Sequence, residues 1–153
     1  MAVVVRRFEA KDVPALLRFG RNFHSTTPVK DDIPFDVSSL ADFIANAYDN
    51  EMIGIWVAEV DGEVVGSTGA ILYPMYFNHN ALVGQEIWWW LEPKSRGSGA
   101  AKKMHEAIED WAREKGAIVL FMIALHNDSV ETMGKLYARS GYKPTERTFA
   151  KRL

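Results

Sequence analysis

The sequence contains no cysteine among its 153 residues. Disulfide bonds, thiolate metal sites and a cysteine nucleophile are therefore excluded. A strong excess of either charge is also absent, because the formal net charge at pH 7 is -2, and this predicts no nucleic-acid partner. The apolar run near the N-terminus, Val3 to Val5, is far shorter than a signal-peptide core or a membrane span. We therefore expect a cytoplasmic protein with no membrane partner.

What is present is typical of a globular protein. Hydrophobic residues make up 48% of the chain and charged residues 25%, which are ordinary values for such proteins. A chain of 153 residues can enclose a hydrophobic core without disulfide or metal cross-links. We predict one domain over residues 1–153.

The first half of the chain alternates between strand and helix patterns. Val3 to Phe8 is β-branched and predicts a strand, and Lys11 to Phe23 has helical spacing, with Asp12 as its N-cap. A second helix is predicted through Leu40 and Ala47, with Ser38 or Ser39 as its cap.

A β-rich section follows. Met52 to Val60 and Glu63 to Tyr73 flank Asp61 and Gly62, a dipeptide favoured in two-residue hairpin turns. Tyr73 to Asn80 is predicted to be a longer, aromatic connection, and Ala81 to Leu91 to be another strand.

The last third is predicted to contain helix, strand, helix and strand. Gly97 to Lys115 has the spacing of a long amphipathic helix that stops at Gly116, and Ala117 to Leu125 predicts a strand. Asp128 or Ser129 can cap a last helix, which Gly141 closes. The end, Tyr142 to Leu153, predicts a strand or strand pair. The order indicates one α/β domain with a mixed sheet.

The segment Pro93 to Lys103 has the features of an anion site. It joins a strand to the long helix, and its small residues allow close approach to free N–H groups at the start of a helix. Four cations and no acid lie between Lys94 and Lys103, so the local field favours a polyanion. Neither the P-loop pattern nor the GxGxxG pattern of dinucleotide folds fits. The alternative to an anion site is a tight turn that binds no ligand, followed by a solvated helix face.

At this point the sequence resembles a known family. Arg96, Gly99 and Ala101 match the R-x-x-G-x-[GA] signature of the Gcn5-related N-acetyltransferases (GNAT), between strand and helix as that family requires. The flanking patterns are similar too: Leu91-x-Pro93 resembles the family's V-x-P, and the residues Tyr137, Gly141 and Tyr142 resemble its Y-x-x-x-G-[FY]. The resemblance runs from about Val3 to Phe149.

The resemblance implies an α/β (α+β) fold with a mixed, mostly antiparallel sheet of six to seven strands and about four helices. It also implies acetyl-CoA as co-substrate and no metal. The acetyl group would be transferred by direct attack of a primary amine on the thioester, and this amine would belong to a small molecule or a protein. It is compatible with a homodimer. The main alternative is an inactive CoA-binding or protein-interaction module, which Val130 supports because the family often has asparagine there.

The resemblance also assigns cofactor-binding residues. The backbone around Trp89 and Leu91 would pair with the pantetheine arm as an added strand does. The pyrophosphate would lie on the loop formed by Arg96, Gly97, Ser98, Gly99, Ala100 and Ala101. Asn127, one helical turn before Val130, either replaces the family's asparagine or caps the helix.

Two residues are candidates for proton transfer. Tyr137 lies where the family has a tyrosine that protonates the departing thiolate, and the alternative is a tyrosine that packs at the edge of the core. Glu86 is the candidate base, or else a solvated or salt-bridged glutamate. On a regular strand Glu86 shares a face with Trp88 and Trp90, and desolvation there would raise its pKa.

The acceptor is not identified by the sequence. The loops His24 to Phe35 and Tyr73 to Asn80 are expected to shape its site, and Asp31, Asp32 and Asp36 would suit a cationic amine unless they are simply solvated. The four histidines show no metal-ligand spacing, and we expect them at the surface.

Overall fold

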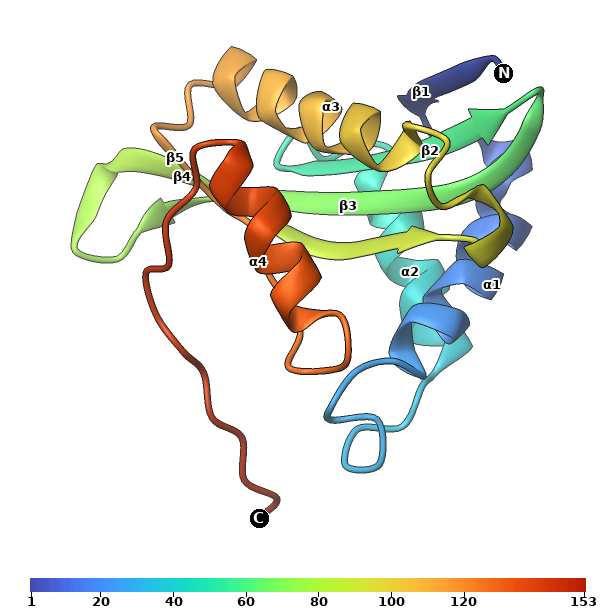
Figure 1. Cartoon of the computed structure of the whole chain (residues 1–153). Coiled ribbons are helices and arrows are strands. Elements are labelled where there is room, and N and C mark those ends of the chain that lie inside the picture. Colours follow the sequence, from blue (N-terminus) through green and yellow to red (C-terminus); the bar gives the residue numbers. More distant parts are fainter.

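A five-stranded sheet in the order β1-β2-β3-β4-β5 forms the middle of the molecule (Figure 1). This computed structural model describes residues 1–153. All neighbouring strands are antiparallel except β4 and β5, which are parallel. The strands are β1 Val3–Arg7, β2 Ile53–Val60, β3 Glu63–Met75, β4 Asn78–Leu91 and β5 Val119–Phe121.

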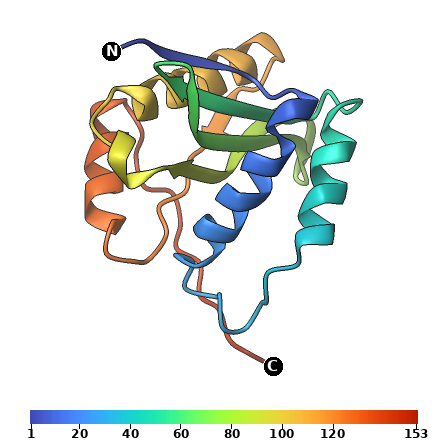
Figure 2. The same cartoon turned by 90° about the vertical axis from the view of Figure 1, so that its right-hand side faces the viewer.

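Helices cover both faces of the sheet. Figure 2 shows α1 and α2 on one side and α4 on the other. The core clusters place α3 on the face opposite α1 and α2. No helix is long and apolar enough to cross a membrane. The helices are α1 Val13–His24, α2 Val37–Ala47, α3 Ala100–Glu114 and α4 Val130–Arg139, and short 3-10 turns span Ala10–Asp12 and Pro93–Ser95.

The core divides between the two faces because side chains alternate along each strand. Ile55 on β2 packs toward α1 and α2 with Leu16 and Ile44, whereas the next residue, Trp56, packs toward α3 with Ile108. Strand β2 is therefore buried on both faces, as its continuous apolar pattern requires.

The predicted hairpin between β2 and β3 is confirmed. Asp61 and Gly62 both have positive φ, at 51° and 82°, as a two-residue type I′ turn requires. The longer connection expected over Tyr73 to Asn80 is wrong, because β3 continues to Met75 and β4 starts at Asn78. A shift of register beside Pro74 lets the ladder continue past this residue, which has no N–H.

Helix α3 starts later than predicted. Gly97 and Gly99 have φ values of 86° and 92°, which lie outside helical geometry, so the helix begins at Ala100. Gly116, with φ of 87°, ends it as predicted.

The sheet has five strands, so the expectation of six to seven is wrong. The predicted strand over Ala117 to Leu125 narrows to Val119–Phe121, and Tyr142 to Leu153 contains no strand. Figure 1 shows this last segment as an extended coil leaving the body of the molecule. Pro144 cannot donate to a ladder, and the segment is rich in cations, so its pairing with β5 is weakly favoured.

One helix cap differs from the prediction, and another has a different role than expected. The cap of α2 is Asp36, whose carboxylate accepts from the Ser39 amide at 3.0 Å, rather than Ser38 or Ser39. Asp12 is the N-cap residue of α1, as predicted, but its side chain makes no capping bond. Its carboxylate instead accepts from Arg6 Nη1 at 2.7 Å.

Candidate functional site

Strands β4 and β5 form a short parallel pair and then separate. Their ladder covers only Val83–Gln85 and Val119–Phe121, whereas β4 continues to Leu91. The outer edge of β4 after Gln85 therefore has no neighbouring strand.

The alternation of the β3–β4 ladder decides which residues face this open edge. The Glu92 amide donates to the Val65 carbonyl at 2.8 Å, and hydrogen-bonded pairs alternate in an antiparallel ladder. Trp88 and Trp90 consequently direct their backbone groups toward β3. The backbone groups that face the open edge belong to Trp89 and Leu91, the two residues expected to pair with pantetheine.

The loop between β4 and α3 leaves several amides free. Those of Ser98 and Ala100 donate within the loop, to Ser95 O and Ser98 Oγ, both at 3.2 Å. The amides of Gly97, Gly99 and Ala101 donate to no protein atom. Free N–H groups at the N-terminus of a fifteen-residue helix attract an anion, and the helix dipole adds to the attraction.

The cations around this loop are not equivalent. Lys94 pairs with Glu63 at 2.8 Å, and Lys103 Nζ donates to the Val3 carbonyl at 2.7 Å. Arg96 has no carboxylate partner. Its Nε donates to the Leu91 carbonyl at 3.3 Å, and its guanidinium carbon lies 5.7 Å from the centre of the Trp90 ring. Arg96 is thus held beside the open edge of β4 with its charge unpaired.

Glu86 does not share a face with Trp88 and Trp90, so this prediction is wrong. The register shifts on β4: Trp88 lies opposite Gly69, whereas Glu86 lies opposite Ala70. The residue between them is extra, which makes a β-bulge and reverses the alternation. Glu86 therefore lies on the α3 face, and Trp88 packs toward α1 and α2.

The environment of Glu86 favours its protonated form. Its side chain is buried, with 3% of its surface exposed, and its only hydrogen bond is from the Ile123 amide to Oε2, at 3.1 Å. Burial raises the pKa of Glu86 to about 8, and the Ile123 amide opposes that rise in part. The predicted rise of the Glu86 pKa is confirmed in direction, but Trp88 and Trp90 do not cause it.

Tyr137 on α4 is buried beside Trp89. The two rings are stacked at 6.2 Å and 24°, and the Tyr137 hydroxyl donates to the Ile123 carbonyl at 2.8 Å. Burial raises the pKa of Tyr137, with a smaller contribution from Glu86, so the hydroxyl keeps its proton at neutral pH. The backbone of a single residue, Ile123, is thus hydrogen-bonded to both candidate proton-transfer groups, Glu86 and Tyr137.

Asn127 joins two loops. Its Oδ1 accepts from the Ser129 amide at 2.9 Å, and its Nδ2 donates to the Thr26 carbonyl at 3.2 Å. The N-cap of α4 is Ser129, so Asn127 forms a turn just before the helix and does not cap it. Its contact with CoA stays a prediction.

The acidic residues expected near an acceptor are only partly free. Asp36 caps α2, and Asp32 lies 3.9 Å from Arg152 of the C-terminal coil. Asp31 is exposed and has no ion-pair partner. This loop reaches the start of α4 through the bond from Asn127 to Thr26, so it borders the same side of the molecule as Tyr137.

One site residue was missed by sequence reasoning. His105 was expected at the surface, but only 4% of it is exposed. Its Nε2 lies 3.0 Å from Glu109 Oε1 and 3.1 Å from the Tyr142 hydroxyl. The spacing of four residues between His105 and Glu109 on an amphipathic helix is the signal that could have indicated it.

A cavity at the other end of α3 contains none of these residues. It is lined by residues of the α2–β2 connection, such as Tyr48 and Asn50, and by Trp111 and Lys115. The candidate site residues therefore lie away from this cavity.

Known proteins share this architecture. The sequence model described as "Acetyltransferase (GNAT) family" matches residues 20–142, and no curated protein matches the chain. The aminoglycoside N-acetyltransferase AAC(6')-Iy in complex with CoA is 16% identical over 99% of this chain and 95% of that one, with a TM-score of 0.78.

Two further solved structures have the same fold. A predicted acetyltransferase with acetyl-CoA from Clostridium acetobutylicum is 20% identical over 98% of this chain and 96% of that one, with a TM-score of 0.72. A ribosomal-protein-alanine N-acetyltransferase from Brucella melitensis biovar Abortus 2308 is 19% identical over all of both chains, with a TM-score of 0.72. Since the family match covers most of the sequence and the fold agrees over its whole length, the chain belongs to the acetyltransferase (GNAT) family.

Proposed function

We propose that this protein transfers the acetyl group of acetyl-CoA to an amine. The observation that carries the proposal is the free amides of Gly97, Gly99 and Ala101 at the N-terminus of α3, beside the unpaired edge of β4. An elongated ligand with a diphosphate at one end and amides along its arm is complementary to these two features together. The complexes with CoA and acetyl-CoA among the similar structures support this ligand.

The proposed binding roles follow from the contacts. The free loop amides and Arg96 hold the pyrophosphate. The open backbone groups of Trp89 and the amide of Leu91 pair with the pantetheine arm, while the Leu91 carbonyl accepts from Arg96. The thioester carbonyl then lies near the bulge of β4, where backbone N–H groups can stabilise the oxyanion of the tetrahedral intermediate.

The proposed proton transfers use Glu86 and Tyr137. The acceptor amine must lose a proton before or during its attack on the thioester carbon. Glu86 can take this proton, directly or through water, when it is ionised, and because its pKa is about 8 the ionised fraction grows as the pH rises toward 8. As the carbon–sulfur bond breaks, the departing thiolate takes the Tyr137 proton. Tyr137 then regains a proton from solvent, and Glu86 releases the proton that it took from the amine. The products are the acetylated amine and free CoA.

The acceptor is an amine of a small molecule or of a protein. The similar structures include an aminoglycoside N-acetyltransferase and a ribosomal-protein-alanine N-acetyltransferase, which represent both classes. The exposed carboxylate of Asp31, on the loop that reaches α4, favours a cationic acceptor.

Titration calorimetry with acetyl-CoA tests the binding assignment. Arg96→Glu removes a cation from the proposed pyrophosphate site and introduces a repelling charge, so we expect the dissociation constant to rise about 10- to 100-fold. Arg18→Glu, on the opposite face of the sheet, makes the same change of net charge and should bind like the wild type. Equal affinities of Arg96→Glu and wild type would remove the pyrophosphate assignment.

Release of free thiol from acetyl-CoA in the presence of an amine panel tests the transfer itself. We expect release that depends on the amine, with a matching acetylated product by mass spectrometry. Tight binding of acetyl-CoA without amine-dependent release from any amine would instead indicate an inactive CoA-binding module.

A further inference from the structure

Three polar side chains form a cluster between α3 and the end of α4, in which His105 is buried and Glu109 and Tyr142 are half-buried. His105 and Glu109 lie one helical turn apart on α3, and Tyr142 follows α4. The Tyr142 hydroxyl donates to Glu109 Oε1 at 2.9 Å, and His105 Nε2 lies 3.1 Å from that hydroxyl. Burying the ring nitrogen of His105 is unfavourable unless it is hydrogen-bonded, so Glu109 and Tyr142 stabilise His105 when they keep these positions.

The hydrogen-bond pattern defines the state of His105. Burial lowers its pKa more than the nearby Glu109 and Glu106 raise it, which leaves a neutral ring with one N–H. Tyr142 gives its only hydroxyl hydrogen to Glu109, so Nε2 must carry the ring hydrogen to contact both oxygen atoms. His105 is therefore a donor that ties α3 to Tyr142.

Tyr142 is in turn bonded to Tyr137 through the end of α4. The Tyr142 amide donates to the Tyr137 carbonyl at 3.0 Å, and the Gly141 amide donates to Ala138 at 3.1 Å. Gly141 has φ of 88°, as in a Schellman cap. Tyr142 thus connects the backbone of Tyr137 to the side chains of α3.

The same residues surround the ring of Tyr137. The His105 ring meets it edge-on, with centroids 6.2 Å apart, and the Tyr142 ring is 5.9 Å away. Trp89 stacks on the Tyr137 ring. The ring is fixed from three elements: β4, α3 and the end of α4.

We propose that His105, Glu109 and Tyr142 are positioning residues that hold the Tyr137 hydroxyl at the open edge of β4. The inference rests on the proposed function, in which Tyr137 protonates the thiolate. Proton transfer requires hydrogen-bond reach, and small misplacements of the donor lower the rate. None of the three positioning residues needs to touch the substrate.

The test is a double-mutant cycle with Tyr142→Phe and Tyr137→Phe. Tyr142→Phe keeps the ring and the amide bond to Tyr137 but removes the hydroxyl that Glu109 and His105 share. We expect kcat to fall about tenfold while KM for acetyl-CoA changes less than about twofold, because the free loop amides do not depend on the cluster. In the Tyr137→Phe background, Tyr142→Phe should have no further effect on kcat.

The control is Glu59→Gln. Glu59 on β2 accepts from Arg6 Nε at 2.8 Å, so this variant weakens a polar network away from the cluster. It should lower stability without lowering kcat at a temperature where the protein is folded. An equal loss from Tyr142→Phe in both backgrounds, or no loss in either, would overturn the positioning role.

A readout independent of activity separates this inference from the proposed function. With ¹³C-labelled tyrosine, the Tyr137 signal is the one that disappears in Tyr137→Phe. Tyr142→Phe should shift or broaden that signal, whereas Glu59→Gln should leave it unchanged. An unchanged Tyr137 signal in Tyr142→Phe overturns the inference, whatever the activity. A shifted signal in a protein that transfers no acetyl group would instead support the positioning role and refute the proposed function.

Discussion

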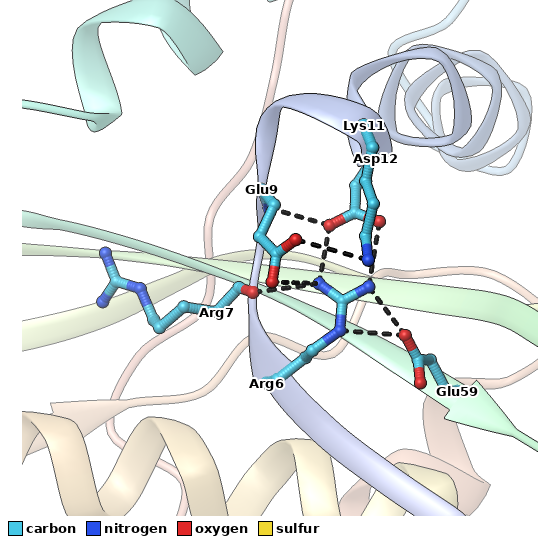
Figure 3. A network of polar contacts seen from close by, with 6 residues as sticks. All are labelled: Arg6, Arg7, Glu9, Lys11, Asp12 and Glu59. Carbon is cyan, nitrogen blue, oxygen red and sulfur yellow. Dashed lines mark hydrogen bonds and ion pairs between the residues drawn. The ribbon is translucent and has the colours of Figure 1, made fainter. Parts of the chain in front are cut away.

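Two carboxylates of this protein have the same small solvent exposure and opposite properties. Asp12 and Glu86 are each 3% exposed. Figure 3 shows Asp12 facing the guanidinium of Arg6, which also contacts Glu59. Glu86 has no cation and only the Ile123 amide.

The difference in partners decides the charge of each carboxylate. Burial by itself raises the pKa of Asp12, but the hydrogen bonds from Arg6 and the Glu9 amide bring it below its ordinary value. Burial raises the pKa of Glu86 to about 8 because no cation opposes it. Asp12 therefore holds a fixed charge that connects β1 to the start of α1, whereas Glu86 can exchange a proton near neutral pH.

The largest expected effect comes from breaking the paired network. Arg6→Ala leaves Asp12 buried without its cation, so we expect the free energy of unfolding to fall by about 3 kcal/mol. The measurement is urea unfolding at neutral pH, together with acetyl transfer at a temperature where the variant is folded. A stability loss below about 1 kcal/mol would show that the pair is only a surface contact.

A smaller effect on the free energy of unfolding is expected when Glu86 is replaced by a residue that does not titrate. The folded protein keeps this proton up to about pH 8, and the unfolded chain releases it near its ordinary value of 4.5. The contribution to stability is therefore complete below about 4.5 and is lost as the pH rises toward 8. In Glu86→Gln this loss is absent, so its stability relative to wild type should rise by about 2 kcal/mol from roughly pH 5 to 7.

The same variant tests the proposed base. A glutamine side chain does not ionise in this pH range, so Glu86→Gln should lower kcat about tenfold or more and remove the rise of the rate toward pH 8. A variant with wild-type kcat and an unchanged pH profile would leave Glu86 a structural ligand of the Ile123 amide and nothing more.

The smallest effect is expected where the charges are solvated. Lys94 and Glu63 form an ion pair at 2.8 Å with both side chains exposed. Lys94→Ala should change the free energy of unfolding by less than about 0.5 kcal/mol and weaken acetyl-CoA binding far less than Arg96→Glu does. A binding loss equal to that of Arg96→Glu would mean that the loop acts through its total charge.

The sequence predicted the order of the main elements and the elements that carry the site. The Asp61–Gly62 hairpin, the stop at Gly116 and the close at Gly141 depend on a few adjacent residues, so local chemistry was sufficient to identify them. The prediction of a strand from Tyr142 to Leu153 was wrong, because Pro144 and several cations interrupt the strand pattern there.

Features that depend on two distant segments could not be predicted in this way. The face of Glu86 depends on one extra residue in β4, which the register with β3 creates and which no pattern within β4 indicates. The sequence around His105 is typical of a surface histidine. The residue is buried because folding brings Tyr142, which lies 37 residues later in the chain, into contact with it.

The sequence by itself determined that a glycine-rich, cationic turn would open a long helix, because backbone conformation and charge are properties of neighbouring residues. Only the tertiary structure decided which groups near that turn can exchange protons. A pKa depends on burial and on charges brought close by folding, and those neighbours come from β4, α3, α4 and the segment after β5.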